Sequence, residues 1–112
     1  MRTSVTRLSV RHAGREVMLD DSRALLTLGR DAQNDLVIAD RMASRTHAHI
    51  ERRRDRYVLV DHSSNGTFLT IDGQPEIELR REEVTLRGTG RIAFGHAHAK
   101  EPGESVDYAC GV

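Results

Sequence analysis

The sequence predicts an all-β fold, a two-sheet β-sandwich of about ten to eleven short strands with binding loops at one end. Apolar and polar residues alternate in short runs along the chain, which is the pattern of strands with one buried face. Turn-forming residues fall between these runs. No window shows sustained helical periodicity with capping residues, so helices are not expected.

Six strands are predicted in the first half of the chain. Leu8 and Val10 share one face of the first run, and Val17 with Leu19 repeats the pattern after a hairpin that contains Gly14. The last of the six, RYVLVD, is the most strand-like because it is rich in valine and holds a tyrosine. The predicted ranges are 7–11, 16–20, 24–29, 35–39, 48–53 and 56–61.

The second half of the chain continues the same pattern. Turns are predicted at Asp72–Gly73, at Gly88 with Gly90, and at Pro102–Gly103. The predicted strands are 67–71, 76–80, 83–87 and 91–95, with 106–110 as a candidate closing strand. In a sandwich, the loops 30–34, 40–47 and 62–66 are expected to lie together, positioned by rigid strands.

Length and charge restrict the function. The 112 residues form one predicted domain over 1–112, with a core over about 5–98 and a C-terminal strand or tail over 104–112. A chain of this size has no second lobe to close an active-site cleft. The 17 basic residues are balanced by 17 acidic ones, which argues against a dedicated nucleic-acid-binding protein.

Location is predicted from the single cysteine and the N-terminus. Cys110 cannot form an intrachain disulfide, which favours a reducing cytoplasm. The N-terminal segment lacks the apolar core of a signal peptide, and no apolar run is long enough to span a membrane. A cytoplasmic protein without a membrane partner is therefore expected.

Groups that suit a phosphate ester gather in the three loops. The sequence has Gly29-Arg30, then Ser44-Arg45-Thr46-His47, and then Ser63-Ser64-Asn65-Gly66-Thr67. A phosphate ester carries about −1.5 to −2 charge and three strong acceptor oxygens, so an arginine fork and a short hydroxyl are suitable ligands. The amide of Asn65 can donate to and accept from a peptide backbone.

This spaced set resembles the signature of the forkhead-associated (FHA) family in both order and interval, over roughly residues 26 to 94. The resemblance implies a module that binds phosphothreonine in a partner protein or in its own parent chain. It also implies no catalysis and no metal or other cofactor. The stretches 69–73 and 79–95 resemble FHA modules fused to bacterial nucleotidyl cyclases, so the chain is expected to be bacterial and regulatory.

The resemblance assigns roles residue by residue. It makes Arg30 and Ser44 the phosphate ligands, Arg45 a second basic contact, and Ser64 with Asn65 the residues that hold the peptide. The structural residues that it implies at the site are Gly29, His47, Gly66 and Asp61.

Met42 lies two residues before Ser44, at a position that takes part in partner specificity in this family. Partner specificity in this family often depends on the residue three places after the phosphothreonine. A methionine here favours an apolar side chain in the partner over an acidic one.

Four other interpretations stay open. The pairs His47/His49 and His96/His98 each share one predicted strand face and could offer imidazoles to a metal, although zinc needs three or four ligands. Ser44, His47 and Asp61 are the residue types of a hydrolase triad, without its G-x-S-x-G elbow. The run 52–54, three arginines, could bind nucleic acid. The chain could also be a phosphate-independent assembly module attached to a signalling enzyme.

Overall fold

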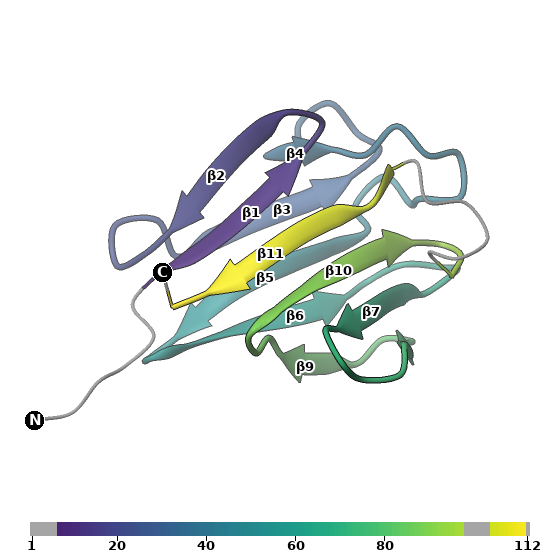
Figure 1. The fold of residues 1–112 in the computed structure, drawn as a ribbon. Helices are drawn as coiled ribbons and strands as arrows, with labels where there is room; N and C mark the ends of the chain where they lie inside the picture. Colours follow the sequence, from purple (N-terminus) through teal and green to yellow (C-terminus); the bar gives the residue numbers. More distant parts are fainter. Residues whose placement is uncertain (1–6, 98–103, 112) are drawn as a thin grey trace, which may run out of the picture.

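Eleven β-strands form within residues 7–97 and 104–111, which are the residues that the computed structural model describes (Figure 1). The strands are β1 (Leu8–His12), β2 (Arg15–Leu19), β3 (Leu25–Gly29), β4 (Leu36–Val37), β5 (Ala48–Arg53), β6 (Arg56–Asp61), β7 (Thr67–Ile71), β8 (Ile77–Leu79), β9 (Glu83–Thr85), β10 (Thr89–Phe94) and β11 (Val106–Cys110).

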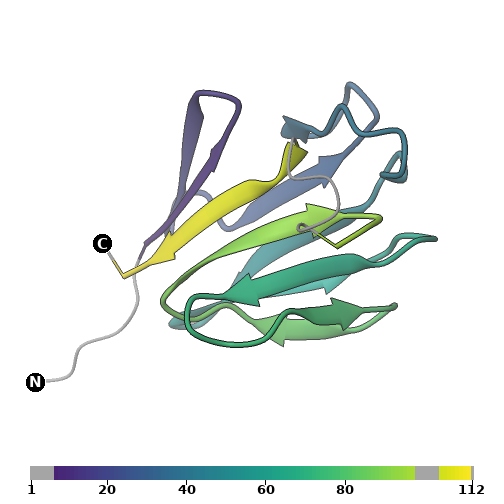
Figure 2. The same ribbon diagram turned by 45° about the vertical axis from the view of Figure 1, so that its right-hand side comes forward.

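The strands make two sheets that lie face to face (Figure 2). The first sheet has the order β2-β1-β11-β10-β7-β8, and the second has the order β4-β3-β5-β6-β9. Every pairing is antiparallel except the short parallel contact between β3 and β4. The predicted two-sheet β-sandwich is confirmed.

The core lies between the sheets and is built by the predicted alternation. Inward side chains of both sheets are fully or almost fully excluded from solvent, because each strand turns every second residue to the interior. The large buried side chains are Leu8, Leu19, Leu26, Leu28, Leu36, Ile38, Ile50, Tyr57, Leu59, Leu69, Ile92 and Phe94. Their packing gives the loops a rigid support.

Several predicted strand ranges differ from the structure at their ends, and β8 and β9 have three residues each instead of five. Two further differences have a clear physical cause. Strand β4 has only two residues instead of five, because the carboxylate of Asp35 accepts from the backbone N–H of Thr27 at 2.8 Å where a strand ladder would continue. Gly90 was predicted to be in a turn but lies inside β10, opposite Tyr108. A Cβ at Gly90 would be 2.7 Å from the Tyr108 hydroxyl, so glycine makes room for that ring. The predicted turn at 102–103 lies outside the described residues.

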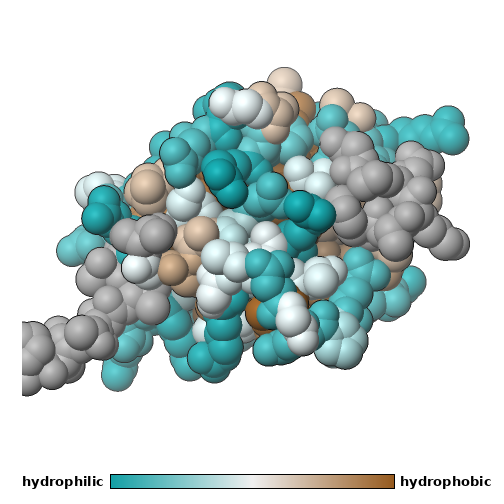
Figure 3. Space-filling model, in the orientation of Figure 1, coloured by the Kyte–Doolittle hydropathy of each residue, from teal (hydrophilic) through white to brown (hydrophobic). Residues whose placement is uncertain are grey.

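The described residues form no broad apolar patch where they are visible in Figure 3. The visible face is the outer side of the first sheet, and it is mostly hydrophilic or intermediate in hydropathy (Figure 3). Large exposed apolar patches are the usual mark of a protein or membrane contact. In the described part of the chain, no helix is long and apolar enough to cross a membrane.

The two ends of the sandwich differ. Arg7 and Gly111 lie side by side at one end, where the Gly111 N–H donates to the Arg7 carbonyl at 2.9 Å. The loops after β3, β4 and β6 lie at the other end (Figure 1). The prediction of one domain with a core over 5–98 stays a prediction, since residues 5, 6 and 98 are not described.

Candidate functional site

Three loops meet at the end of the sandwich away from Arg7 and Gly111. The first loop (30–35) joins β3 to β4, the second loop (38–47) joins β4 to β5, and the third loop (62–66) joins β6 to β7. The first two loops are joined by backbone hydrogen bonds, from Arg30 N–H to the Ser44 carbonyl at 3.0 Å and from Asp31 N–H to the Arg45 carbonyl at 3.1 Å. Side chains then connect all three loops.

Gly29 allows the close approach of the first two loops. An added Cβ would lie 2.2 Å from the Arg45 carbonyl oxygen and 2.8 Å from the Asn34 amide nitrogen. The same Asn34 amide donates to the Arg45 carbonyl at 2.7 Å and to the Asp31 carbonyl at 2.9 Å. The predicted structural role of Gly29 therefore has a physical cause, which is the space that the second loop occupies.

Arg30 and Ser44 lie on the same rim. The Nε of Arg30 donates to the carbonyl of Ala43 at 2.9 Å, so the guanidinium lies against the peptide unit that precedes Ser44. The Ser44 hydroxyl oxygen accepts from the backbone N–H of Ser64 at 3.1 Å, which leaves its own hydrogen free to donate to a ligand. A cation and a hydroxyl donor are thus available together, as an anionic ester requires.

His47 is completely buried and connects the second and third loops. Its Nδ1 accepts from the Ser44 backbone N–H at 2.9 Å, so the proton of the neutral ring is on Nε2, which donates to the Gly66 carbonyl at 2.9 Å. Burial lowers the pKa of His47 and outweighs the hydrogen bond to Gly66 and the fields of Asp61 and Asp40, which act to raise it. The imidazole is therefore neutral and fixes Ser44 relative to Gly66.

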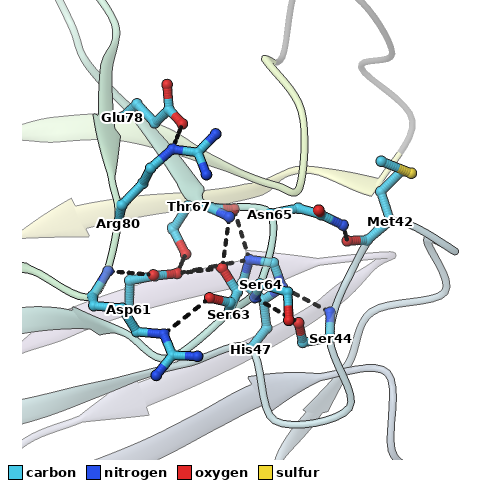
Figure 4. A network of polar contacts seen from close by, with 12 residues as sticks. Met42, Ser44, His47, Asp61, Ser63, Ser64, Asn65, Thr67, Glu78 and Arg80 are labelled. Carbon is cyan, nitrogen blue, oxygen red and sulfur yellow. Dashed lines mark hydrogen bonds and ion pairs between the residues drawn. The ribbon is translucent and has the colours of Figure 1, made fainter.

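Below the third loop, Asp61 is a buried carboxylate, 2% exposed, with hydrogen bonds to both oxygens (Figure 4). Oδ1 accepts from the hydroxyls of Ser63 at 2.6 Å and Thr67 at 2.5 Å, and Oδ2 accepts from the Arg81 backbone N–H at 2.8 Å. Burial alone would raise the pKa of Asp61, but these hydrogen bonds outweigh it and lower the pKa. Asp61 is consequently an anion that orders the loop.

Gly66 closes this network. Its N–H donates to the Ser63 hydroxyl at 2.8 Å, and its carbonyl accepts from His47 and from the Gly95 N–H. Its φ of +95° lies in the left-handed region, where a side chain is disfavoured. Glycine at this position lets the chain turn into β7 while the carbonyl faces His47.

Asn65 and Met42 lie together on the rim, where the third loop meets the second (Figure 4). The Asn65 amide donates to the Met42 carbonyl at 3.1 Å, and Asn65 is otherwise exposed, so its amide oxygen is open to a peptide N–H. The Met42 side chain is 41% exposed. Gly95 packs against its backbone, where a Cβ at Gly95 would be 2.3 Å from the Met42 carbonyl.

Arg45 is the least connected of the predicted ligands. Its carbonyl is held by Asn34 and Asp31, whereas its guanidinium is exposed and has no hydrogen bond or ion pair within residues 7–97 and 104–111. The structure therefore brings Arg30, Ser44, Ser64, Asn65 and Met42 to one rim and leaves the Arg45 side chain at its edge.

Three contributors were not assigned from the sequence. Asn34, Ser63 and Arg81 hold the loops through side-chain contacts to backbone groups. The two Ser63 contacts span two and three residues and could have been inferred from the local spacing of Asp61, Ser63 and Gly66. No local pattern indicated Arg81, which comes from a distant turn.

The hydrolase interpretation is wrong on geometry. Both ring nitrogens of His47 are bonded to backbone groups of Ser44 and Gly66, so neither is available to the Ser44 hydroxyl. The nearest Asp61 oxygen is 4.0 Å from His47 Nε2 and is engaged by Ser63 and Thr67. No base is therefore aligned on a nucleophile.

The predicted histidine pair does not form a common face. His47 is buried between loops, whereas His49 points outward and stacks on His62 with ring centroids 4.8 Å apart. The strand begins only at residue 48, so the period-two argument did not apply to His47. His98 lies outside the described residues, and the residues that are described contain no group of three or more potential metal ligands.

The three arginines at 52–54 are largely neutralised. Arg52 pairs with Asp21 at 2.7 Å, and Arg53 pairs with Glu51 and Glu83. Arg54 forms the turn between β5 and β6 with a φ of +62°. Two of the three arginines, Arg52 and Arg53, therefore belong to a surface ion-pair network, so the run is not a free basic patch.

A β-sandwich whose rigid loops present a guanidinium, a hydroxyl and an amide together has the groups of a binding module. The family model of the FHA domain matches residues 26–95, and the chain belongs to the FHA family. FHA domains are phosphopeptide-binding modules and not enzymes, so the predicted class of protein is confirmed. No curated protein matches the chain.

Solved structures share this fold. The first FHA domain of Mycobacterium tuberculosis Rv1747 is 25% identical, with a TM-score of 0.69 over 98% of this chain and 100% of that one. M. tuberculosis EmbR with a low-affinity phosphopeptide is 24% identical, with a TM-score of 0.70 over 93% of this chain and 24% of that one. The FHA domain of Chlamydia trachomatis CT664 is 23% identical, with a TM-score of 0.67 over 96% and 98% of the two chains.

Proposed function

We propose that this FHA domain binds phosphothreonine in a partner protein, or in its own parent chain, through the rim formed by the three loops. Arg30 and Ser44 bind the phosphate, Arg45 adds a second cation, and Ser64 with Asn65 holds the peptide beside it. The supporting observation is the meeting of the Arg30 guanidinium with the Ala43–Ser44 peptide unit, next to a Ser44 hydroxyl whose hydrogen is free.

The binding loops are preorganised for the phosphopeptide. Before a ligand arrives, His47, Asn34 and the Asp61 network hold the loops with hydrogen bonds. Little conformational entropy is then lost when the ligand is bound, so more of the charge-assisted hydrogen bonding appears as affinity. The phosphate needs no metal, because arginine supplies the positive charge.

Specificity on one side of the phosphothreonine is assigned to Met42, whose exposed side chain lies next to Asn65. We expect it to contact an apolar residue of the partner, three places after the phosphothreonine. The FHA domain of MEK1, solved with a phosphothreonine peptide of HOP1, and EmbR with its phosphopeptide support the phosphate-dependent interpretation over the assembly alternative.

A bacterial cytoplasmic setting is part of the proposal. It is supported by M. tuberculosis and C. trachomatis among the similar structures and by the lone thiol of Cys110, whose pKa burial raises. The link to a nucleotidyl cyclase stays a prediction.

Calorimetry with one peptide in phosphothreonine, phosphoserine and unphosphorylated forms tests the proposal. We expect binding only to phosphorylated peptides, with phosphothreonine preferred. Arg30→Ala removes a charged partner of the phosphate, which typically costs about 2–5 kcal/mol, so binding should be nearly abolished. Arg56→Ala, an exposed arginine at the far end, is the matched control and should bind normally. Equal affinity for all three peptides would contradict the proposal.

A further inference from the structure

Arg81 lies outside the three loops, in the turn between β8 and β9, but it is fixed against the third loop. Its Nε donates to the Ser63 carbonyl at 3.2 Å, and its backbone N–H donates to the buried Asp61 carboxylate at 2.8 Å. Its φ of +56° is in the left-handed region, which is uncommon for a residue with a side chain. These two contacts and the defined backbone conformation therefore fix the position of the Arg81 Nε atom.

The charge of Arg81 has no acidic partner among the described residues. Its neighbour Arg80 is ion-paired with Glu78, and Glu82 accepts from the Arg80 backbone N–H at 3.2 Å. Asp61, the carboxylate that the Arg81 backbone contacts, is buried with both oxygens occupied. The terminal nitrogens of the exposed Arg81 side chain are thus available to a ligand.

Arg81 and Met42 contact opposite ends of the same short segment. Arg81 binds the carbonyl of Ser63, just before Ser64, and Met42 accepts from Asn65, just after it. A phosphothreonine held at Ser64 and Ser44 would continue in both directions as an extended chain, at about 3.3 Å per residue. One flank of the peptide would then approach Met42 and the other would approach Arg81.

We propose that Arg81 is a specificity-determining residue of this FHA site, which binds an anionic side chain among the residues that precede the phosphothreonine. The proposal rests on the proposed function, in which Met42 contacts the peptide residues that follow the phosphothreonine. The anion is a carboxylate or a second phosphate, since both match the planar arginine fork. The domain would then select a partner that is acidic before the phosphothreonine and apolar after it.

The test is a peptide series measured by calorimetry at one salt concentration. All peptides share one phosphothreonine and carry Glu, Gln or phosphoserine at each of the three positions before and the three after it. An exposed ion pair contributes about 0.2–1 kcal/mol, so the wild type should bind the Glu peptide up to about fivefold more tightly than the Gln peptide at one preceding position. Phosphoserine there should bind at least as tightly as Glu.

Variants assign the effect to Arg81. Arg81→Asn should equalise the affinities for the Glu and Gln peptides, and asparagine tolerates the left-handed backbone. Arg81→Lys should keep part of the preference, and Arg56→Gln should keep all of it. Three results would each overturn the proposal. The wild type could bind the Glu and Gln peptides equally, it could prefer Glu only at positions after the phosphothreonine, or Arg81→Asn could keep the preference of the wild type. Phosphothreonine binding by Arg30→Ala would instead contradict the proposed function itself.

Discussion

At the scale of single residues, His47 is the contact on which the loop arrangement depends. Its two nitrogens satisfy one donor and one acceptor of the backbone, which only the neutral ring with its proton on Nε2 can do. A protonated ring would turn both nitrogens into donors and oppose the Ser44 N–H. Low pH should therefore disrupt the loop arrangement by protonating the His47 ring.

The folded domain should lose stability as the pH falls below about 6.5, the ordinary pKa of histidine. Because burial lowers the pKa of His47 in the folded state, the unfolded chain takes up the proton first, and stability is lost down to the folded pKa. Urea unfolding of the free domain from pH 8 to 5 measures this effect. Asp61, whose pKa is lowered, loses its contribution only at still lower pH, below about 3.8.

His47→Gln separates this effect from the other histidines. The variant should be less stable at pH 8 by about 1–3 kcal/mol, because it leaves buried backbone groups unsatisfied. It should also show a smaller decrease between pH 6.5 and 5. A decrease identical to that of the wild type would assign the pH dependence to a group other than His47.

At the scale of elements, the end of β3 is packed directly against the second loop. The space that a side chain at Gly29 would need is occupied by the Arg45 carbonyl and the Asn34 amide, both part of the site. Gly29→Ala should therefore cost about 1–3 kcal/mol of unfolding free energy, as overpacking does, and should weaken phosphopeptide binding. Thermal unfolding and calorimetry measure the two effects.

Gly73→Asn is the matched control for Gly29→Ala. Gly73 lies in the turn between β7 and β8, with a φ of +84° and open space around it, and asparagine accepts that conformation. Its effect on stability should be small and its effect on binding absent. Unchanged peptide affinity in Gly29→Ala would show that the second loop can move without loss of the site.

The strands were predictable because their alternation is local, and β5, β6 and β7 begin and end as predicted. Gly90 was misassigned because its place depends on Tyr108, eighteen residues further along the chain. At the site, the motifs indicated Arg30, Ser44 and Asn65. The support from Arg81 was not predictable, since it arises from the pairing of β6 with β9 and not from any neighbour in sequence.

At the scale of the whole molecule, the binding loops and the turn at 72–73 lie at opposite ends of β7. A four-residue Gly/Ser insertion between Asp72 and Gly73 should leave peptide affinity within about twofold, because surface turns accept added length at a low entropic cost. The same insertion between Ser64 and Asn65 should abolish binding. Calorimetry compares the two, and equal losses would contradict a site confined to one end.

The adjacency of Arg7 and Gly111 bears on whether a threonine in the same polypeptide can reach the pocket. A segment leaving at Gly111 must first run back along the sandwich, past one strand of five or six residues and the loops beyond it. At about 3.3 Å per residue, this path takes on the order of ten extended residues. For binding within one polypeptide, the segment between Gly111 and the threonine must therefore contain at least about ten residues. A threonine on another molecule has no such length requirement.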